Sequence, residues 1–420
     1  MNVLKKMRPI SLLSSSLALL TGFLATLAQA TTVEINAKFS PDPTNPRLNA
    51  FINTTPNSGL CNTFPMFCES RGLHSILLGF EAQSQKPILA NHTDIRQGAM
   101  IKVPAQVRII QVRSETGQAV DLEFSITAFS GTNRTRDVRE LTGRPPGSSS
   151  NTAQSVLWNG APWGFDAPDP CLLASGAYAT SIDADYFWQT PEASACGKSP
   201  AFDIDSLLLR NASVSYLMIT PEPLKMESGI YRGSITYDVG PGKDFDFGDV
   251  LLPTKDSVTF NFTLDIQHIL KFLFPAGADR LALNPAGGWQ QWINHGRRPE
   301  KLVADQDFKM WSSTSFSMKL QCEHTMGMHC GIKNPAGDAV AVETRVTLPS
   351  GLQDDANQPV TRYPLSTVPA VFMPTYYVDN GRAALHFEVG REQVKGMTEA
   401  HSGSTYSGNV TIIWDSNITP

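Results

Sequence analysis

The segment from Trp158 to Cys196 gathers the residue types that bind sugars. Aromatic rings stack on the apolar faces of sugar rings, and carboxylates accept hydrogen bonds from sugar hydroxyl groups. A disulfide between Cys171 and Cys196 would hold the segment at its base. We therefore predict a glycan-binding site formed by Trp158, Trp163, Asp183, Asp185, Tyr186 and Trp188. The alternative is that the rings belong to the hydrophobic core and the acids to turns.

No pattern typical of catalysis occurs in the sequence. It contains no Gly-x-Ser-x-Gly, His-Glu-x-x-His, P-loop or dinucleotide-binding glycine pattern. Asp183 and Asp185 lack the glycine and closing glutamate of an EF-hand calcium loop. We predict no catalytic residue, no metal site and no cofactor. A glycosidase uses two carboxylates that leave no short motif, so a secreted β-sandwich carbohydrate-active hydrolase remains the alternative.

The first thirty residues have the layout of a secretory signal peptide. Three basic residues within the first eight precede an apolar run over 10–27, and Ala28-Gln29-Ala30 has the small-x-small pattern of a cleavage site. The mature chain is expected to begin at Thr31 and to be exported. Cleavage lowers the formal net charge from −5 to about −8, which gives no support to nucleic-acid binding. No later stretch has the ~20 apolar residues of a membrane span.

The chain has six cysteines, which fall into three close pairs: Cys61 and Cys68, Cys171 and Cys196, Cys322 and Cys330. An even number of cysteines in an exported chain favours disulfides over metal or redox chemistry. Because each close pair closes a short loop, we expect the cysteines to pair locally. One or more long-range bridges are the alternative.

Apolar and polar residues alternate over 120–128, 258–266, 339–348 and 383–389. This period of two puts one face of a strand on a core and the other in solvent, as in antiparallel sheets. Clusters of glycine and proline separate these stretches. The mature chain, at about 390 residues, exceeds one typical domain. The sequence predicts an all-β protein of two β-sandwich domains.

The joint between the two domains is expected to follow the strand at 257–267. The next segment, 269–275, is strongly apolar and can begin a second sandwich. The predicted organisation is a signal peptide at 1–30, an N-terminal domain at 31–268 and a C-terminal domain at 269–420.

Four segments resemble the CblD-like tip adhesins of class 5 and related chaperone–usher fimbriae. TFNFTLDIQHILKFLFP at 259–275 is similar to their joint between adhesin and pilin domains, and RLALNPAGG at 280–288 to the opening of their pilin domain. GIYRGSITY at 229–237 resembles a hairpin near the end of their adhesin domain, and YSGNVTII at 406–413 their final strand. The likeness covers roughly the last 200 residues, and residues 31–200 show none.

The resemblance implies a C-terminal pilin domain that is an immunoglobulin-like sandwich without its last strand. A periplasmic chaperone lends a strand to such a domain during export. At the outer-membrane usher, the N-terminal extension of the adjacent pilin subunit replaces it. Strands at 316–322 and 410–414 would border the vacant position. Val410, Ile412 and Trp414 would be the alternating contacts to the lent strand, and inward-facing Ile413 is the alternative.

The resemblance also implies a tip adhesin on the cell surface, whose N-terminal domain binds a receptor, which we expect to be a glycan. Thr31–Phe39 would be the first strand of that domain, and the alternative is that it serves as a donor strand. Some class 5 adhesins carry receptor-binding arginines where this chain has Thr236 and Tyr237, so no receptor residue is carried over. A structural fibre initiator without receptor binding is the remaining alternative.

Overall fold

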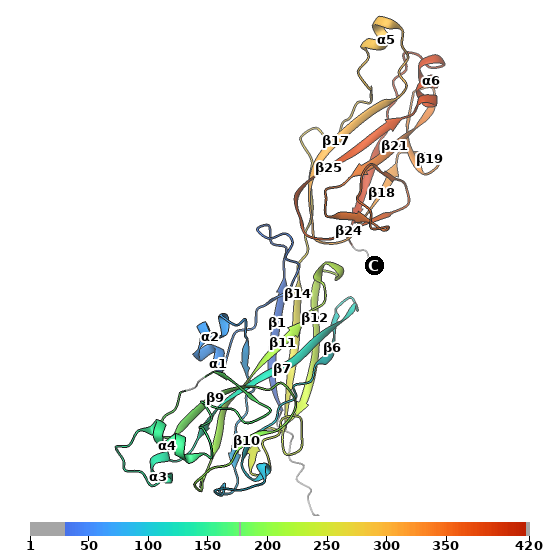
Figure 1. Ribbon diagram of the computed structural model, residues 1–420. Coiled ribbons are helices and arrows are strands. Elements are labelled where there is room, and N and C mark those ends of the chain that lie inside the picture. Colours follow the sequence, from blue (N-terminus) through green and yellow to red (C-terminus); the bar gives the residue numbers. More distant parts are fainter. Residues whose placement is uncertain (1–29, 176–177, 417–420) are drawn as a thin grey trace, which may run out of the picture.

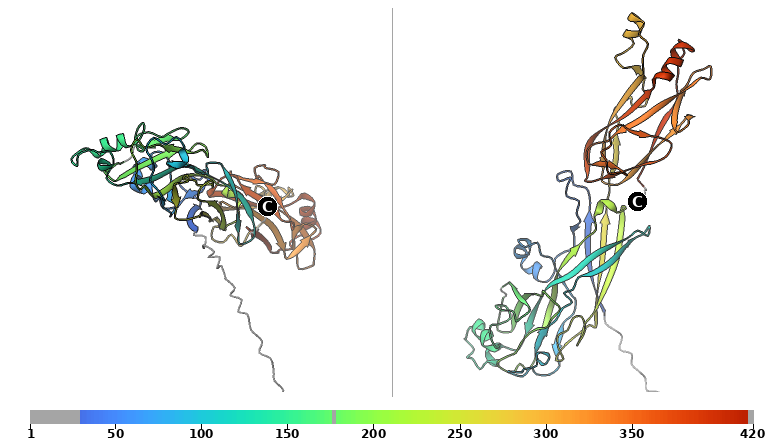
Figure 2. Two further views of the ribbon diagram at one scale, coloured as in Figure 1. Left: turned by 90° about the horizontal axis from the view of Figure 1, so that it is seen from below. Right: turned by 45° about the vertical axis from the view of Figure 1, so that its right-hand side comes forward.

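The computed structural model describes residues 30–175 and 178–416. Figure 1 shows two lobes end to end, built from strands β1–β14 and β15–β26, and the turned views in Figure 2 agree. Strands make up most of the elements, so the predicted all-β class with sandwich-like sheets is confirmed. The predicted signal peptide stays a prediction, because residues 1–29 lie outside the described part. No helix of the described residues is long and apolar enough to cross a membrane.

A twelve-stranded sheet forms the N-terminal lobe. Its main path runs β13-β4-β11-β7-β6-β12-β14-β1-β2, with β3 on β11 and with β9 between β7 and β8; β5 and β10 pair separately. The strands are β1 Ala30–Phe39, β2 Ile52–Asn53, β3 Ser75–Leu77, β4 Ala82–Ser84, β5 Ala99–Ile101, β6 Arg108–Ser114, β7 Ala119–Arg134, β8 Leu172–Ser175, β9 Asp183–Gln189, β10 Cys196–Lys198, β11 Leu208–Ile219, β12 Gly229–Asp238, β13 Leu251–Pro253 and β14 Ser257–Ile266.

Strand β14 is paired on both edges and buried on its inward face. Its inward residues are almost fully buried, from Val258 through Phe260 to Ile266, all at 2% exposure or less. It pairs with β12 on one edge and, in parallel, with all ten residues of β1 on the other. Residues Thr31–Phe39 are therefore part of a strand of their own lobe, as predicted.

Two sheets form the C-terminal lobe. One has eight strands in the main order β15-β17-β25-β21-β20-β19, with β16 on β17 and β23 on β21; the other has the order β22-β24-β18-β26. The strands are β15 Leu270–Leu273, β16 Asn284–Pro285, β17 Leu302–Ser312, β18 Phe316–Cys322, β19 His324–Met326, β20 His329–Lys333, β21 Ala339–Thr347, β22 Leu352–Asp354, β23 Tyr363–Leu365, β24 Ala370–Pro374, β25 Val378–Val389 and β26 Val410–Asp415. A core that includes Phe308, Met318 and Phe372 lies between them.

The helices are short and lie in the connections between strands. They are α1 Leu60–Thr63, α2 Pro65–Glu69, α3 Val138–Leu141, α4 Ser150–Leu157, α5 Gln290–His295 and α6 Arg391–Glu399, with 3₁₀ turns at Ile95–Gln97 and Pro223–Lys225.

Three disulfides close local loops. The bridges are Cys61–Cys68, Cys171–Cys196 and Cys322–Cys330. The predicted local pairing is confirmed, and the long-range alternative is wrong. The second bridge ties the loop before β8 to β10 and so encloses 172–195, the part of the predicted sugar site that contains Asp183, Asp185, Tyr186 and Trp188.

The chain passes from one lobe to the other at Gln267–Ile269. The His268 ring lies 2.9 Å from the Met226 carbonyl oxygen through Nε2 and 3.1 Å from the Ser313 hydroxyl through Nδ1. A second contact joins the lobes where the Tyr377 N–H donates to the Pro46 carbonyl oxygen at 3.1 Å. Because the sheets on either side share no strand, we propose that the domain boundary falls at 268/269.

Candidate functional site

The last strand of the C-terminal lobe, β26, has a free edge. It pairs with β18 in antiparallel register, from Ser317 opposite Asp415 to Cys322 opposite Val410. Among the described strands it has no second neighbour, because it ends the order β22-β24-β18-β26. A strand in this position presents backbone N–H and C=O groups that another strand can pair with.

The apolar side chains of β26 face the core of the lobe. Val410, Ile412 and Trp414 pack against it, and they lie opposite Cys322, Leu320 and Met318, respectively. All three remain half-buried, and Ile413 is not among the residues packed on that core. The alternation predicted for Val410, Ile412 and Trp414 therefore matches the face that they present. Their contact with a lent strand stays a prediction.

Strand β15 ends the facing sheet. Its Phe272 ring lies 4.0 Å from the Trp414 ring, measured between centroids. Both rings also contact Phe316, at 6.2 and 5.9 Å. No strand pairing joins β15 to β26 among the described residues, so the two sheets touch through side chains there. We call the free edge of β26 together with β15 the open edge.

Apolar side chains near the open edge are poorly covered. Leu273 of β15 is 52% exposed, and Ile269 and Phe274, directly before and after that strand, are 38% and 37% exposed. Residues 274–283 form no strand, although the sequence there is partly apolar. Clustered exposed apolar residues beside an unpaired strand mark a surface that another chain can cover. The sequence marked 269–275 as apolar but did not identify these side chains as part of a site.

The two lobes differ in whether the first strand pairs with the last strand. In the N-terminal lobe the first strand, β1, pairs along the whole of the last strand, β14. In the C-terminal lobe the first strand, β15, does not pair with the last strand, β26. Accordingly the inward residues of β14 are fully buried, whereas those of β26 are only half-buried. The edge of the last strand is paired in the first lobe and unpaired, among the described strands, in the second; we call this unpaired position the vacancy.

The aromatic residues predicted to stack on sugars lie in the core. Trp158, Trp163, Tyr186 and Trp188 are 3%, 1%, 1% and 0% exposed. The Trp163 and Trp188 rings stack at 4.5 Å, and the Trp188 Nε1–H donates to the Trp163 carbonyl oxygen at 2.9 Å. The expectation that these rings are exposed is wrong. The edges of β9 pair with β7 and β8, and its consecutive residues Tyr186, Phe187 and Trp188 are all buried, so both faces of the strand are covered. Ligand binding by this segment stays a prediction. It would have to occur without stacking of these rings on a sugar.

The two predicted acids are held by partners from neighbouring strands. Asp183 accepts hydrogen bonds from Arg134 and Arg210, each at 2.8 Å, and the bond from Arg134 is the main reason that its pKa lies below the usual value. Asp185 accepts one from the Thr132 hydroxyl at 2.7 Å, and burial raises the pKa of Asp185. Both carboxylates therefore tie strands of the lobe together.

No family model matches the chain, and no curated protein matches it. The resemblance to CblD-like adhesins therefore stays a prediction. One solved structure that it matches is the CsuC–CsuE chaperone–tip adhesion subunit pre-assembly complex from archaic chaperone–usher Csu pili of Acinetobacter baumannii. The match has 8% identity and a TM-score of 0.21, and it covers 92% of this chain and 98% of the other. We base no conclusion on it, because so low a TM-score does not establish a common arrangement of elements.

Proposed function

We propose that this protein is a non-enzymatic subunit of a chaperone–usher fibre whose C-terminal lobe accepts a strand from another protein. The observation that carries the proposal is the vacancy beside β26, at the position that β1 fills beside β14. A strand added at the open edge would satisfy backbone groups of β26 and cover Val410, Ile412 and Trp414.

The resemblance to chaperone–usher fimbriae supplies the partners that we propose for this lobe. A periplasmic chaperone supplies the strand during export, the outer-membrane usher exchanges it, and the N-terminal extension of the adjacent subunit takes its place. Exchange is needed because an unpaired apolar edge would otherwise join other chains and aggregate.

We propose that the subunit lies at the tip of the fibre, and the N-terminal lobe supports this position. Residues Ala30–Phe39 are already paired within their own sheet, so they do not serve as a donor strand. A complete lobe in front of an incomplete one suits a terminal subunit on the cell surface. In this proposal the N-terminal lobe binds a receptor, which we take to be a glycan.

The test is a thermal unfolding measurement on the mature chain, residues 31–420, with peptides from the N-terminal extensions of major pilins. A peptide that fills the vacancy at about 100 times its Kd stabilises the fold by about 2.7 kcal/mol. In a lobe of this size that raises the midpoint by roughly 5 °C or more. Scrambled peptides of the same composition are the control. A midpoint that no extension peptide moves would refute strand acceptance.

A further inference from the structure

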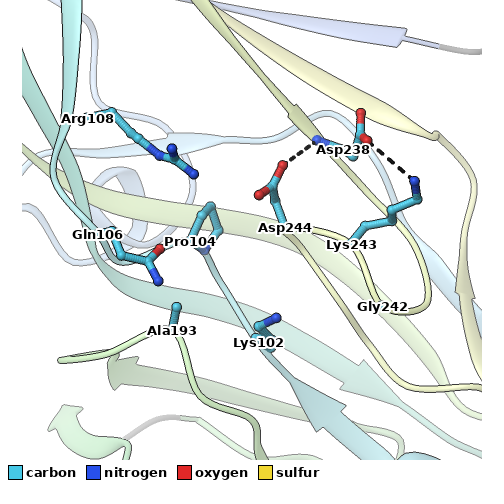
Figure 3. A pocket seen from close by; sticks show the side chains of 9 residues that line it. All are labelled: Lys102, Pro104, Gln106, Arg108, Ala193, Asp238, Gly242, Lys243 and Asp244. Carbon is cyan, nitrogen blue, oxygen red and sulfur yellow. Dashed lines mark hydrogen bonds and ion pairs between the residues drawn. The ribbon is translucent and has the colours of Figure 1, made fainter.

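A polar cavity of about 390 Å³ lies in the N-terminal lobe. Figure 3 shows the nine side chains that line it. They come from the loop after β5, the start of β6, the loop between β9 and β10, and the end of β12 with the loop that follows it. The volume lies in the range of about 300–1,000 Å³ that small-molecule sites occupy.

The cavity lies at the end of the lobe that is farthest from the C-terminal lobe. Asp238, which lines it, is the last residue of β12. The first residue of that strand, Gly229, pairs with Ile266 beside the joint. Ten residues of strand at about 3.3 Å each put about 30 Å between the joint and the cavity.

The lining of the cavity is cationic, although the chain is acidic. It contains Lys102, Arg108 and Lys243 but only two carboxylates, Asp238 and Asp244. Lys243 is paired with Asp238 at 3.5 Å. Within the described ranges, 30–175 and 178–416, Lys102 and Arg108 have no ion pair and no side-chain hydrogen bond. Two positive charges are therefore available to a ligand.

An ion pair between buried Asp246 and half-buried Arg96 fixes the wall of the cavity. Asp246, whose side chain is 2% exposed, binds Arg96 at 2.8 Å and accepts the N–H of Gly242 at 2.9 Å. Its backbone also pairs with that of Lys102, by hydrogen bonds of 2.8 and 3.0 Å. The hydrogen bonds from Arg96, Gly248 and Gly242 outweigh burial and keep the pKa of Asp246 low. Since Gly242 and Lys102 line the cavity, its shape is held before a ligand arrives.

We propose that this cavity binds a carboxylate-bearing saccharide, with Arg108 and Lys102 holding its carboxylate. Asp238 and Asp244 accept hydrogen bonds from its hydroxyl groups, and Ala193 provides an apolar contact. Guanidinium groups bind carboxylates through paired, charge-assisted hydrogen bonds, which are stronger than neutral ones. The inference deepens the proposed function, because it gives the receptor-binding lobe a site and a class of ligand at its outer end.

The test is binding of 3′-sialyllactose, a glucuronic-acid disaccharide and lactose to the mature chain, measured by calorimetry. We expect at least one acidic saccharide to bind and lactose not to bind. Lys102→Gln and Arg108→Gln should each weaken binding by about tenfold or more and leave the thermal midpoint unchanged, because neither side chain has a partner to lose. Arg144→Gln, which removes the same charge from a distant loop, is the matched control.

Four results would overturn the proposal. Two concern the saccharides: lactose binds as tightly as the acidic saccharides, or no saccharide binds at all. Two concern the site: acidic-saccharide binding survives both substitutions, or inorganic sulfate at equal concentration abolishes it, which marks an unselective anion site. The extension-peptide and saccharide measurements on the wild-type chain separate the two ideas. A peptide-induced rise without saccharide binding removes only this inference, and absence of the rise removes the proposed function itself.

Discussion

At the scale of single residues, the environment of a side chain decides its role more than its type does. Trp188 and Tyr186 belong to residue types that bind sugars, and they were marked for that reason. In the structure their rings fill the interior beside Trp163, at centroid distances of 4.5 and 4.7 Å. The acids beside them hold strands together.

We predict that Trp188→Ala destabilises the fold by about 3–5 kcal/mol, as expected for removal of a buried aromatic ring. The loss combines the cavity that is left with the missing hydrogen bond to the Trp163 carbonyl oxygen. Urea unfolding of the mature chain measures it. Exposed Tyr178→Ala, in the same segment, is the control and should change the free energy of unfolding by less than ~1 kcal/mol. A fully stable Trp188→Ala protein would contradict the assignment to the core.

The sequence could not predict that these rings are buried, and the reason is physical. Period-two alternation predicts which residues share a face of a strand, but a second strand or a loop can cover the other face as well. In β9 both faces are covered, and Tyr186, Phe187 and Trp188 are all buried. The charged cavity was missed because Lys102, Arg108 and Asp244 come from segments that only the fold brings together.

At the scale of elements, the sequence predicted the strands well. The stretches at 120–128, 258–266 and 339–348 correspond to β7, β14 and β21, and the start of the mature chain is β1. Local disulfides followed from spacing alone. The vacancy beside β26 could not be derived from alternation, because the residue pattern of a strand is the same whether or not its edge is paired. The family resemblance alone suggested it.

We predict that Ile412→Asp abolishes the rise in thermal midpoint that an extension peptide causes. A carboxylate on the inward face would have to be buried beneath the added strand, and burial of an unpaired charge is unfavourable. Thr411→Asp changes the neighbouring exposed residue on the opposite face and is the matched control. It should keep most of the rise. Equal responses from the two variants would show that the peptide does not cover the inward face.

At the scale of the whole molecule, the two candidate sites lie in different lobes, on either side of the joint. His268 sits at that joint, between the Met226 carbonyl oxygen in one lobe and the Ser313 hydroxyl in the other, with the Phe39 ring 5.5 Å away. Burial is the main reason that the pKa of His268 lies below its ordinary value, so the ring is neutral in the folded chain near pH 7.

We predict that the joint weakens as the pH falls. The unfolded chain binds a proton at this histidine below about pH 6.5, whereas the folded chain resists it. The contribution to stability is therefore complete above about 6.5 and is lost as the pH falls toward the lower pKa of the folded state. Thermal midpoints between pH 7.5 and 5.5 should fall less for His268→Gln than for the wild type. His295→Gln, on exposed α5, should behave like the wild type, and identical slopes for all three proteins would contradict the role of His268.

In the proposed fibre, the arrangement of β14 would have a mechanical consequence under flow. Tension between the outer cavity and the open edge would pass through Gln267–Ile269 and pull β14 along its own length. The hydrogen bonds of β14 to β1 and β12 lie across that direction over ten residues, so they share the load together and do not break one after another. The weakest point on this line is then the joint between the lobes, where a few contacts around His268 and Pro46 resist separation. The subunit is built to bend or extend there while the strands on the line of force stay paired.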